Sequence, residues 1–337
     1  MSKIRVLSET DIKQIISLKL AINAVEDAYK QKSNNKGNVW PLVFYEYEHN
    51  IFDLDIRSGN LKDSNAYGLK LISYNENNPK NELPKVYATA MLFNDKTGEP
   101  LAILNASPIT SYRTGAAAAI GAKYLAKKDS KNLLIVGTGN VAKYSTAATL
   151  LLMDNIEKVY LYNSRRVIDN NELLLFKDEV KRLLQESNKE SNANFYIVND
   201  IEKTTGISDI IITTTPSEKP IIDSRWVNNG THFSCMGAGI VGQQEIYEAL
   251  FSKARTIADD EEQCLTHGEA QTAFKKKIIN KFDAEIGDII LGKTIGRKND
   301  EDITIFDSTG LFIQDLATSM ELINESKRKN IGTEIKL

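Results

Sequence analysis

Short apolar runs alternate with longer amphipathic segments through the middle of the chain. The run at 133–136 is wholly apolar and partly β-branched, which is typical of a strand buried on both faces. Similar apolar runs predict strands at 158–162, 195–198, 209–213, 231–235 and 254–258. Helix-like segments lie between them at 143–153, 172–186 and 244–250. Strands and helices that alternate at this spacing predict an α/β fold with a doubly wound parallel sheet of the Rossmann type.

The N-terminal part of the chain follows another pattern. Strands are predicted at 4–7, 39–47, 51–56, 68–73, 86–93 and 101–105, and the last two are joined by a turn of the hairpin type. Apolar residues at helical spacing predict helices at 18–29, 110–127 and 311–329, and the polar residues 31–38 predict a loop. The N-terminal part is therefore expected to be mainly antiparallel.

The length and composition of the chain indicate how many domains, and which kinds of ligand, to expect. A chain of 337 residues, with 26% charged residues and a net charge of −3, is expected to form two globular domains and to bind neither nucleic acid nor membrane. Cys235 and Cys264 lie far apart, so we expect no disulfide and a cytoplasmic location. His49, His232 and His267 have no metal-ligand spacing, and no metal site is predicted.

The strand at 133–136 leads directly into a G-x-G-x-x-A sequence at 137–142. In the dinucleotide fingerprint, Gly137 would make the tight turn, Gly139 would let the backbone approach a pyrophosphate, and Ala142 would let the helix pack closely on the sheet. Because a strand precedes this sequence and a helix and second strand follow it, we predict a site for a nicotinamide or flavin dinucleotide. The alternative is a glycine turn that binds nothing.

The end of the second strand bears on the choice of cofactor. Sites for NAD carry an acidic residue there, about 20 residues after the glycines, to bind the ribose 2′-hydroxyl. This chain instead has Asn163, Ser164, Arg165 and Arg166. Guanidinium groups bind phosphate through charge-assisted hydrogen bonds. We therefore predict that NADP(H) is preferred and that NAD(H) is possible; the alternative is that both arginines are merely solvated.

Other polar residues follow the later strands. The strand at 209–213 is followed by Thr214, Thr215 and Pro216, at the sheet edge where a dinucleotide lies, so contacts with the cofactor are expected. The alternative is a plain strand-end turn. His232 is interpreted as a core histidine rather than a base, and Cys235 as a small buried hydrophobic residue.

A set of motifs resembles the ornithine cyclodeaminase/μ-crystallin family over essentially the whole chain. They are Arg113-Thr-x-Ala before the glycine fingerprint, Gly98-x-Pro100, the segment from Gly237 to Glu245, Asp307-Ser-Thr-Gly310, and Asp315. The resemblance implies homodimers in which residues 1–115 plus 310–337 form a substrate-binding and dimerisation domain. Residues 116–309 would form the NAD(P)-binding Rossmann domain. It also implies hydride transfer between nicotinamide and a carbon that carries an amino or imino nitrogen.

The resemblance also implies the site residues. Lys70 and Arg113 match the family's cations for the substrate carboxylate, and a buried Lys70 could also give a proton to an imine nitrogen. The alternatives are a surface lysine and a salt bridge on a helix face. The residues expected to contact the dinucleotide are Thr114, Gly137, Thr138, Gly139, Asn140, Val141, Asn163, Ser164, Arg165, Arg166, Thr214, Thr215, Pro216, Met236, Gly237 and Ser308.

Two departures from the family pattern narrow the expected chemistry. Gly239 stands where cyclodeaminases carry a catalytic aspartate, and Arg57 falls where they carry a glutamate that contacts the ornithine tail. Arginine would repel a cationic side chain and favour a carboxylate. We therefore expect an amino-acid dehydrogenase or ketimine reductase for small amino or imino acids with neutral or acidic side chains. The alternatives are an ornithine or lysine cyclodeaminase, and a μ-crystallin-like protein that binds NADPH with little turnover.

Overall fold

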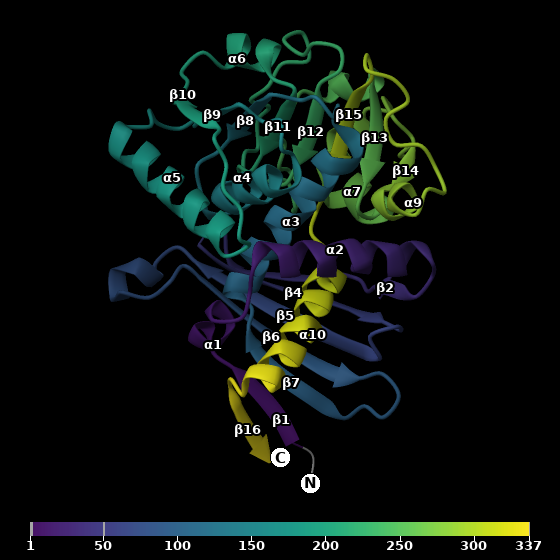
Figure 1. Ribbon diagram of the computed structural model, residues 1–337. Helices are drawn as coiled ribbons and strands as arrows, with labels where there is room; N and C mark the ends of the chain where they lie inside the picture. Colours follow the sequence, from purple (N-terminus) through teal and green to yellow (C-terminus); the bar gives the residue numbers. More distant parts are fainter. Residues whose placement is uncertain (1–2, 50, 337) are drawn as a thin grey trace. The chain divides into compact units, whose positions relative to one another are not determined.

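The computed structural model describes residues 3–49 and 51–336 (Figure 1). The chain divides into two compact units: unit 1 comprises Met1–Arg113 and Leu311–Leu337, and unit 2 comprises Thr114–Gly310. The boundary between them falls within helix α3 (Ser107–Leu125). The roles expected for the two parts, substrate binding with dimerisation and dinucleotide binding, stay predictions.

Unit 2 contains a wholly parallel sheet of eight strands. Its order is β10-β9-β8-β11-β12-β15-β13-β14, so the chain begins near the middle and winds outward in both directions. This confirms the predicted doubly wound sheet. The strands are β8 (Asn132–Val136), β9 (Lys158–Tyr162), β10 (Asn194–Ile197), β11 (Ile210–Thr213), β12 (His232–Cys235), β13 (Ala254–Ala258), β14 (Ala284–Glu285) and β15 (Ile303–Asp307).

The helices of unit 2 lie between these strands in the chain. They are α4 (Asn140–Leu152), α5 (Asn170–Gln185), α6 (Ile201–Ile207), η2 (Glu248–Ser252), α7 (Glu261–His267), α8 (Gln271–Lys275) and α9 (Ile286–Ile290). The predicted helix at 244–250 is wrong, because only a 3₁₀ turn forms, at Glu248–Ser252. The backbone N–H groups of Glu245 and Ile246 bond instead to the Glu269 carboxylate, and Ile246 forms a bridge with Ile222. These long-range partners hold the segment extended.

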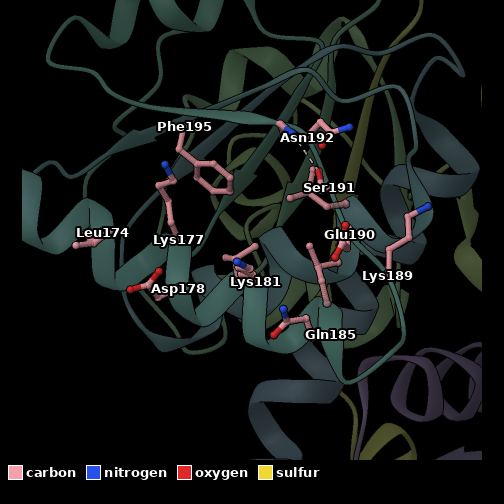
Figure 2. Close-up of a pocket in the computed structure, with 14 residues that line it drawn as sticks. Leu174, Lys177, Asp178, Lys181, Gln185, Lys189, Glu190, Ser191, Asn192 and Phe195 are labelled. Carbon is pink, nitrogen blue, oxygen red and sulfur yellow. Dashed lines mark hydrogen bonds between the residues drawn. The ribbon is translucent and has the colours of Figure 1, made fainter.

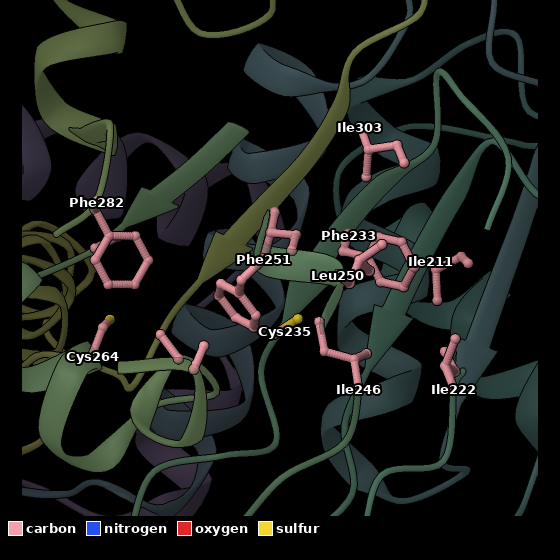
Figure 3. Packing of buried hydrophobic residues seen from close by; sticks show 14 of the residues in the cluster. Ile211, Ile222, Phe233, Cys235, Ile246, Leu250, Phe251, Cys264, Phe282 and Ile303 are labelled. Carbon is pink, nitrogen blue, oxygen red and sulfur yellow. The ribbon is translucent and has the colours of Figure 1, made fainter. Parts of the chain in front are cut away.

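Large apolar side chains pack between the sheet of unit 2 and its covering segments (Figure 3). Phe233 and Ile303 come from the sheet, and Phe251 and Phe282 come from segments that cover it. Each such side chain contributes about 2–3 kcal/mol when fully buried. Cys235 and Cys264 are both free and buried, which confirms the interpretation of Cys235 as a small buried residue.

His232 is a core residue, as predicted. Its Nδ1 lies 2.9 Å from Thr304 Oγ1 and its Nε2 lies 3.0 Å from Ser234 Oγ. Complete burial and the charge of Arg297 hold the pKa of the ring well below its usual value, so the imidazole is neutral.

Unit 1 contains a mixed sheet of eight strands. The order is β16-β1-β7-β6-β5-β4-β2, with β3 also paired to β4, and among the described residues of this unit only β1 and β7 are parallel neighbours. The strands are β1 (Lys3–Leu7), β2 (Gly37–Val39), β3 (Val43–Glu48), β4 (Phe52–Leu61), β5 (Ala66–Asn75), β6 (Val86–Asn94), β7 (Pro100–Asn105) and β16 (Thr333–Lys336). The strand predicted at 39–47 is thus two strands, interrupted at Pro41, which has no N–H for a ladder.

Two long helices cover the sheet of unit 1. Helix α2 (Leu18–Ser33) packs on α10 (Phe312–Lys329), and α10 also contacts β4 and β5 (Figure 1). Helix α2 extends into the predicted loop at 31–38. The short helices are α1 (Glu9–Lys13) and η1 (Asn78–Asn81). None of the described helices combines the length and apolar character needed to cross a bilayer.

Candidate functional site

The turn that leaves β8 requires glycine at its first position. Gly137 has φ +101°, in the left-handed region that disfavours side chains. A Cβ atom there would lie 2.7 Å from Thr214 Oγ1 and 3.0 Å from Thr215 Cγ2. The backbone N–H of Gly137 bonds to the carbonyl of Tyr162 at the end of β9, at 2.8 Å. The turn is therefore fixed between two neighbouring strands.

The start of helix α4 is shaped for an anion. Gly139 is its N-cap residue and supplies no side chain to satisfy the first-turn N–H groups. A Cβ atom built on Gly139 would meet nothing within 4 Å. Thr138, Asn140 and Val141 flank this open space, and Ala142 is completely buried behind it. The N–H groups of the first helical turn and the helix dipole favour a phosphate group here, so the residues present fit a dinucleotide pyrophosphate.

The predicted arginine pair at the end of β9 has a counter-charge that the sequence reasoning missed. Arg166 forms a two-pronged ion pair with Glu172, in the first turn of α5. Thr138 Oγ1 donates to the same carboxylate at 3.4 Å and accepts from Asn163 Nδ2 at 3.0 Å. Ser164 and Arg165 are exposed. In the sequence, Glu172 could be recognised only as an acidic residue near the start of a helix, six residues after Arg166.

Residues predicted at the ends of β11, β12 and β15 all lie at the carboxyl edge of the sheet. Thr214 bonds through its backbone N–H to the carbonyl of Val136 at 2.9 Å, and Met236 bonds in the same way to Thr213. The Ser308 hydroxyl donates to the buried Asp259 carboxylate at 2.7 Å. Pro216 is exposed and Thr114, in α3, is buried; Thr215 and Gly237 are discussed below.

Unit 1 brings together the three cations predicted to bind substrate. Lys70, on β5, is completely buried, and its Nζ lies 2.7 Å from Asp315 Oδ1 on α10. The Arg113 Nε lies 3.5 Å from the same oxygen, and its guanidinium donates to Gln314 Oε1 at 3.1 Å. The alternative that Lys70 is a surface lysine is therefore wrong. Asp315 appeared among the sequence motifs, but not as a site residue.

Arg57 lies directly opposite Lys70 on the neighbouring strand β4. Like charges that face each other across a strand pair are destabilising. Arg57 Nε is paired with Asp55 Oδ2 at 3.3 Å, on its own strand. The structure thus brings Lys70, Arg57 and Arg113 together with the carboxylates of Asp55 and Asp315.

The electrostatics of this cluster differ for its two buried members. Burial lowers the pKa of Lys70 to about 8, although the Asp315 carboxylate opposes the shift. Burial would raise the pKa of Asp315, but the charges of Lys70 and Arg113 outweigh it and lower that pKa. Among the described residues, Asp315 Oδ2 has no hydrogen-bond donor. A lysine of this kind can both hold an anion and release a proton near neutral pH.

A surface hollow elsewhere in unit 2 contains none of the predicted site residues (Figure 2). It measures about 440 Å³ and is lined by residues of α4, α5, β10 and the segment before β10, including Lys177, Lys181, Gln185 and Phe195. Among the residues that the structure describes, no group of three or more histidine, cysteine or acidic side chains is arranged to hold a metal ion.

The chain is similar over nearly its whole length to several known proteins. A family model described as the ornithine cyclodeaminase/mu-crystallin family matches residues 2–330. An alanine dehydrogenase of Archaeoglobus fulgidus is 35% identical over 334 residues, which cover 98% of each chain.

Two solved structures share the fold and more than a quarter of the sequence. An archaeal alanine dehydrogenase dimer with bound NAD has a TM-score of 0.86 and 34% identity, and the match covers 99% of each chain. A Δ1-pyrroline-2-carboxylate reductase of Thermococcus litoralis, in complex with NADH and L-proline, has a TM-score of 0.88 and 30% identity. That match covers 98% of this chain and all of the other.

Proposed function

Because the chain belongs to the ornithine cyclodeaminase/mu-crystallin family, we propose that it is an NAD(P)H-dependent oxidoreductase that acts on the C–N bond of an α-amino or α-imino acid. The observation that carries this proposal is the buried cluster of Lys70, Arg113 and Asp315. Burying charged side chains costs free energy unless they are paired with opposite charges, and such buried groups are common at functional sites. Lysine and arginine at such a buried position can bind the carboxylate of a substrate.

The residues of the cluster have separate roles in the proposed reaction. Arg113 binds the substrate carboxylate through two parallel hydrogen bonds, and Arg57 adds positive charge nearby. When bound, the reduced nicotinamide supplies the hydride that the C=N carbon takes up. Lys70 Nζ gives a proton to the imine nitrogen, which leaves an amino acid and a neutral lysine, and the lysine is reprotonated from solvent. Asp315 holds Lys70 in place and favours its protonated form.

The loop after β12 argues against cyclodeamination. Gly239 has no side chain to act as a base, and its backbone N–H bonds to Gln243 Oε1 at 2.9 Å. Without an acidic group at this position, removal of a proton from an amino acid nitrogen has no evident acceptor there. We therefore place reduction of an imino acid ahead of ornithine or lysine cyclodeamination.

We also propose that NADP(H) is preferred to NAD(H). No carboxylate ends β9, and in the part of the chain that the structure describes no hydrogen bond or ion pair involves the Arg165 side chain. A 2′-phosphate would bind Arg165 and compete with Glu172 for Arg166. One observation favours NAD(H) instead, because the Glu172 carboxylate lies beside Thr138 and could accept a ribose hydroxyl. The ratio of KM values for NADPH and NADH decides between them.

A homodimer agrees with the exposed surface of unit 1. Val43, Phe44, Tyr45 and Tyr47 on β3 are all exposed, and large exposed apolar side chains such as these are available for contact with a second copy of the chain. Size-exclusion chromatography with light scattering tests the dimer. Two free, buried cysteines agree with the expected cytoplasmic location.

The proposed activity is tested by following oxidation of NADPH and NADH with two groups of substrates. One group pairs 2-oxo acids with ammonia or methylamine, and the other contains cyclic ketimine carboxylates. We expect turnover with at least one neutral or acidic member. Tight coenzyme binding without oxidation across the panel would indicate a binding protein, and release of ammonia and proline from ornithine would indicate a cyclodeaminase.

A further inference from the structure

Glu245 joins two loops that sequence analysis assigned to the cofactor. Its Oε1 accepts from the backbone N–H and the hydroxyl of Thr215, at 2.6 and 2.7 Å. Its Oε2 accepts from the backbone N–H of Gly237 at 3.0 Å. Thr215 follows β11 and Gly237 follows β12. One completely buried carboxylate therefore fixes the ends of two neighbouring parallel strands.

The contact at Gly237 is close enough to exclude any side chain there. A Cβ atom on Gly237 would lie 2.4 Å from Glu245 Oε2 and 2.3 Å from the carbonyl oxygen of Thr215. Backbone and carboxylate are thus in direct contact, and neither loop can shift without breaking a hydrogen bond to Glu245.

Further buried carboxylates hold Glu245 itself. Glu269 Oε1 accepts from the backbone N–H groups of Glu245 and Ile246, at 2.8 and 2.7 Å. Asp307, at the end of β15, accepts in turn from the N–H groups of Glu269 and Ala270, at 3.1 and 2.9 Å. Each carboxylate fixes the backbone that carries the next, and the series ends at the Thr215 and Gly237 loops.

Within residues 3–49 and 51–336, no cation offsets the burial of this series. Among the described residues, no lysine, arginine or histidine forms an ion pair with Glu245, Glu269 or Asp307. Burying a carboxylate without a cation is expensive. A glutamine would offer one acceptor oxygen, whereas the carboxylate offers two, which is what bonding to both loops requires.

We propose that Glu245 is a positioning residue for the dinucleotide, which it favours by fixing the Thr215 and Gly237 loops in their binding geometry. This inference rests on the proposed function, because it assigns both loops to coenzyme binding. Glu245 acts on the coenzyme only through those loops, so its effect is on coenzyme affinity more than on the chemical step.

The charge of Glu245 changes near neutral pH. Burial raises its pKa to about 7, against the hydrogen bonds from Thr215 and Gly237. The titratable groups that its charge affects are Glu269, Asp307 and Cys235, from three different segments. Protonation converts one acceptor oxygen to a donor, so a hydrogen bond to one loop is lost as the pH falls through about 7.

The experiment compares the wild-type protein with Glu245→Gln and with Glu262→Gln, an exposed glutamate on α7. The dissociation constants of NADPH and NADH are measured by fluorescence titration from about pH 6 to about pH 8.5, and thermal unfolding of the coenzyme-free proteins is recorded over the same range. We expect Glu245→Gln to weaken binding about tenfold at the upper end, as one or two lost hydrogen bonds imply. Its affinity should not vary through pH 7, whereas that of the wild type and Glu262→Gln should weaken as the pH falls.

The outcomes separate this inference from the proposed function. If a folded Glu245→Gln protein binds coenzyme as tightly as the wild type at every pH, the positioning role is refuted and the proposed function is untouched. If the variant does not fold, Glu245→Asp replaces it, because the shorter carboxylate keeps the charge but cannot reach both loops, and an unchanged coenzyme affinity in a folded Glu245→Asp protein also refutes the role. Failure of the wild type to bind either coenzyme refutes the proposed function itself.

Discussion

Replacing Lys70 with methionine separates its chemical role from its structural cost. The side chain is completely buried, and its pKa falls from 10.5 to about 8. A shift of this size corresponds to about 3 kcal/mol that the folded protein loses at neutral pH by burying the charged form. Methionine removes that cost and fills a similar volume. Arg113 Nε, 3.5 Å from Asp315 Oδ1, still compensates the charge of the Asp315 carboxylate. We therefore expect Lys70→Met to change the free energy of unfolding by no more than about 2 kcal/mol.

The same substitution should nearly abolish activity. Loss of a charge-assisted hydrogen bond costs about 1.5–3 kcal/mol, and loss of a general acid costs about 10²–10⁴-fold in rate. Together they predict a fall in kcat/KM of at least about 10³-fold for imine reduction. In the wild type, kcat/KM should decline above about pH 8, because the required proton leaves Lys70 there.

Urea unfolding of both proteins from neutral to alkaline pH checks the structural part. The folded-state pKa of Lys70 lies below its unfolded value, so its contribution is most favourable above pH 10.5 and is lost as the pH falls through about 8. The stability of the wild type minus that of Lys70→Met should therefore rise over this interval. A variant with activity within tenfold of the wild type, or a stability difference that does not vary with pH, would refute the reasoning.

Four further substitutions test other parts of the account. Gly137→Ala should lower the melting temperature and weaken coenzyme binding, because its Cβ would lie 2.7 Å from Thr214 Oγ1 at a positive φ. Gly139→Ala should weaken coenzyme binding and leave the melting temperature unchanged, because its Cβ would meet nothing within 4 Å. Equal melting temperatures for the two variants would contradict this. Asp315→Asn should destabilise the protein by about 3 kcal/mol in urea unfolding. It should also move the alkaline limb of the kcat/KM profile below pH 8, because it removes the charge that raises the pKa of Lys70. An alkaline limb at the wild-type pH would exclude the pairing of Asp315 with Lys70. Arg165→Ala should raise KM for NADPH about tenfold and leave KM for NADH unchanged, and an equal effect on both would remove the argument for a 2′-phosphate contact.

Local patterns were sufficient to predict much of unit 2. The glycine turn and the buried strand before it depend on neighbouring residues, so β8 and the start of α4 follow from the sequence. The segment at 244–250 was wrongly predicted as a helix, because its backbone partners lie on residues far along the chain, such as Glu269.

The ion pairs of the site could not be predicted from local sequence either, because the fold brings their members together. Lys70 and Asp315 are 245 residues apart, and only the folded sheet and α10 bring them within 2.7 Å. The pairing of Arg166 with Glu172 depends on how the loop after β9 meets α5. Residue type indicated the cations of the site, but not the carboxylates that set their charge and position.

Hydride transfer to the carbon of a C=N bond is the central claim, and isotope labelling measures it directly. The enzyme is incubated with a cyclic ketimine carboxylate and reduced coenzyme carrying deuterium on the transferred face of nicotinamide C4, and the amino acid formed is analysed by mass spectrometry and NMR. We predict one deuterium at Cα, with none reaching that position from deuterated solvent when the coenzyme is unlabelled. A product whose Cα hydrogen comes from solvent would contradict the account.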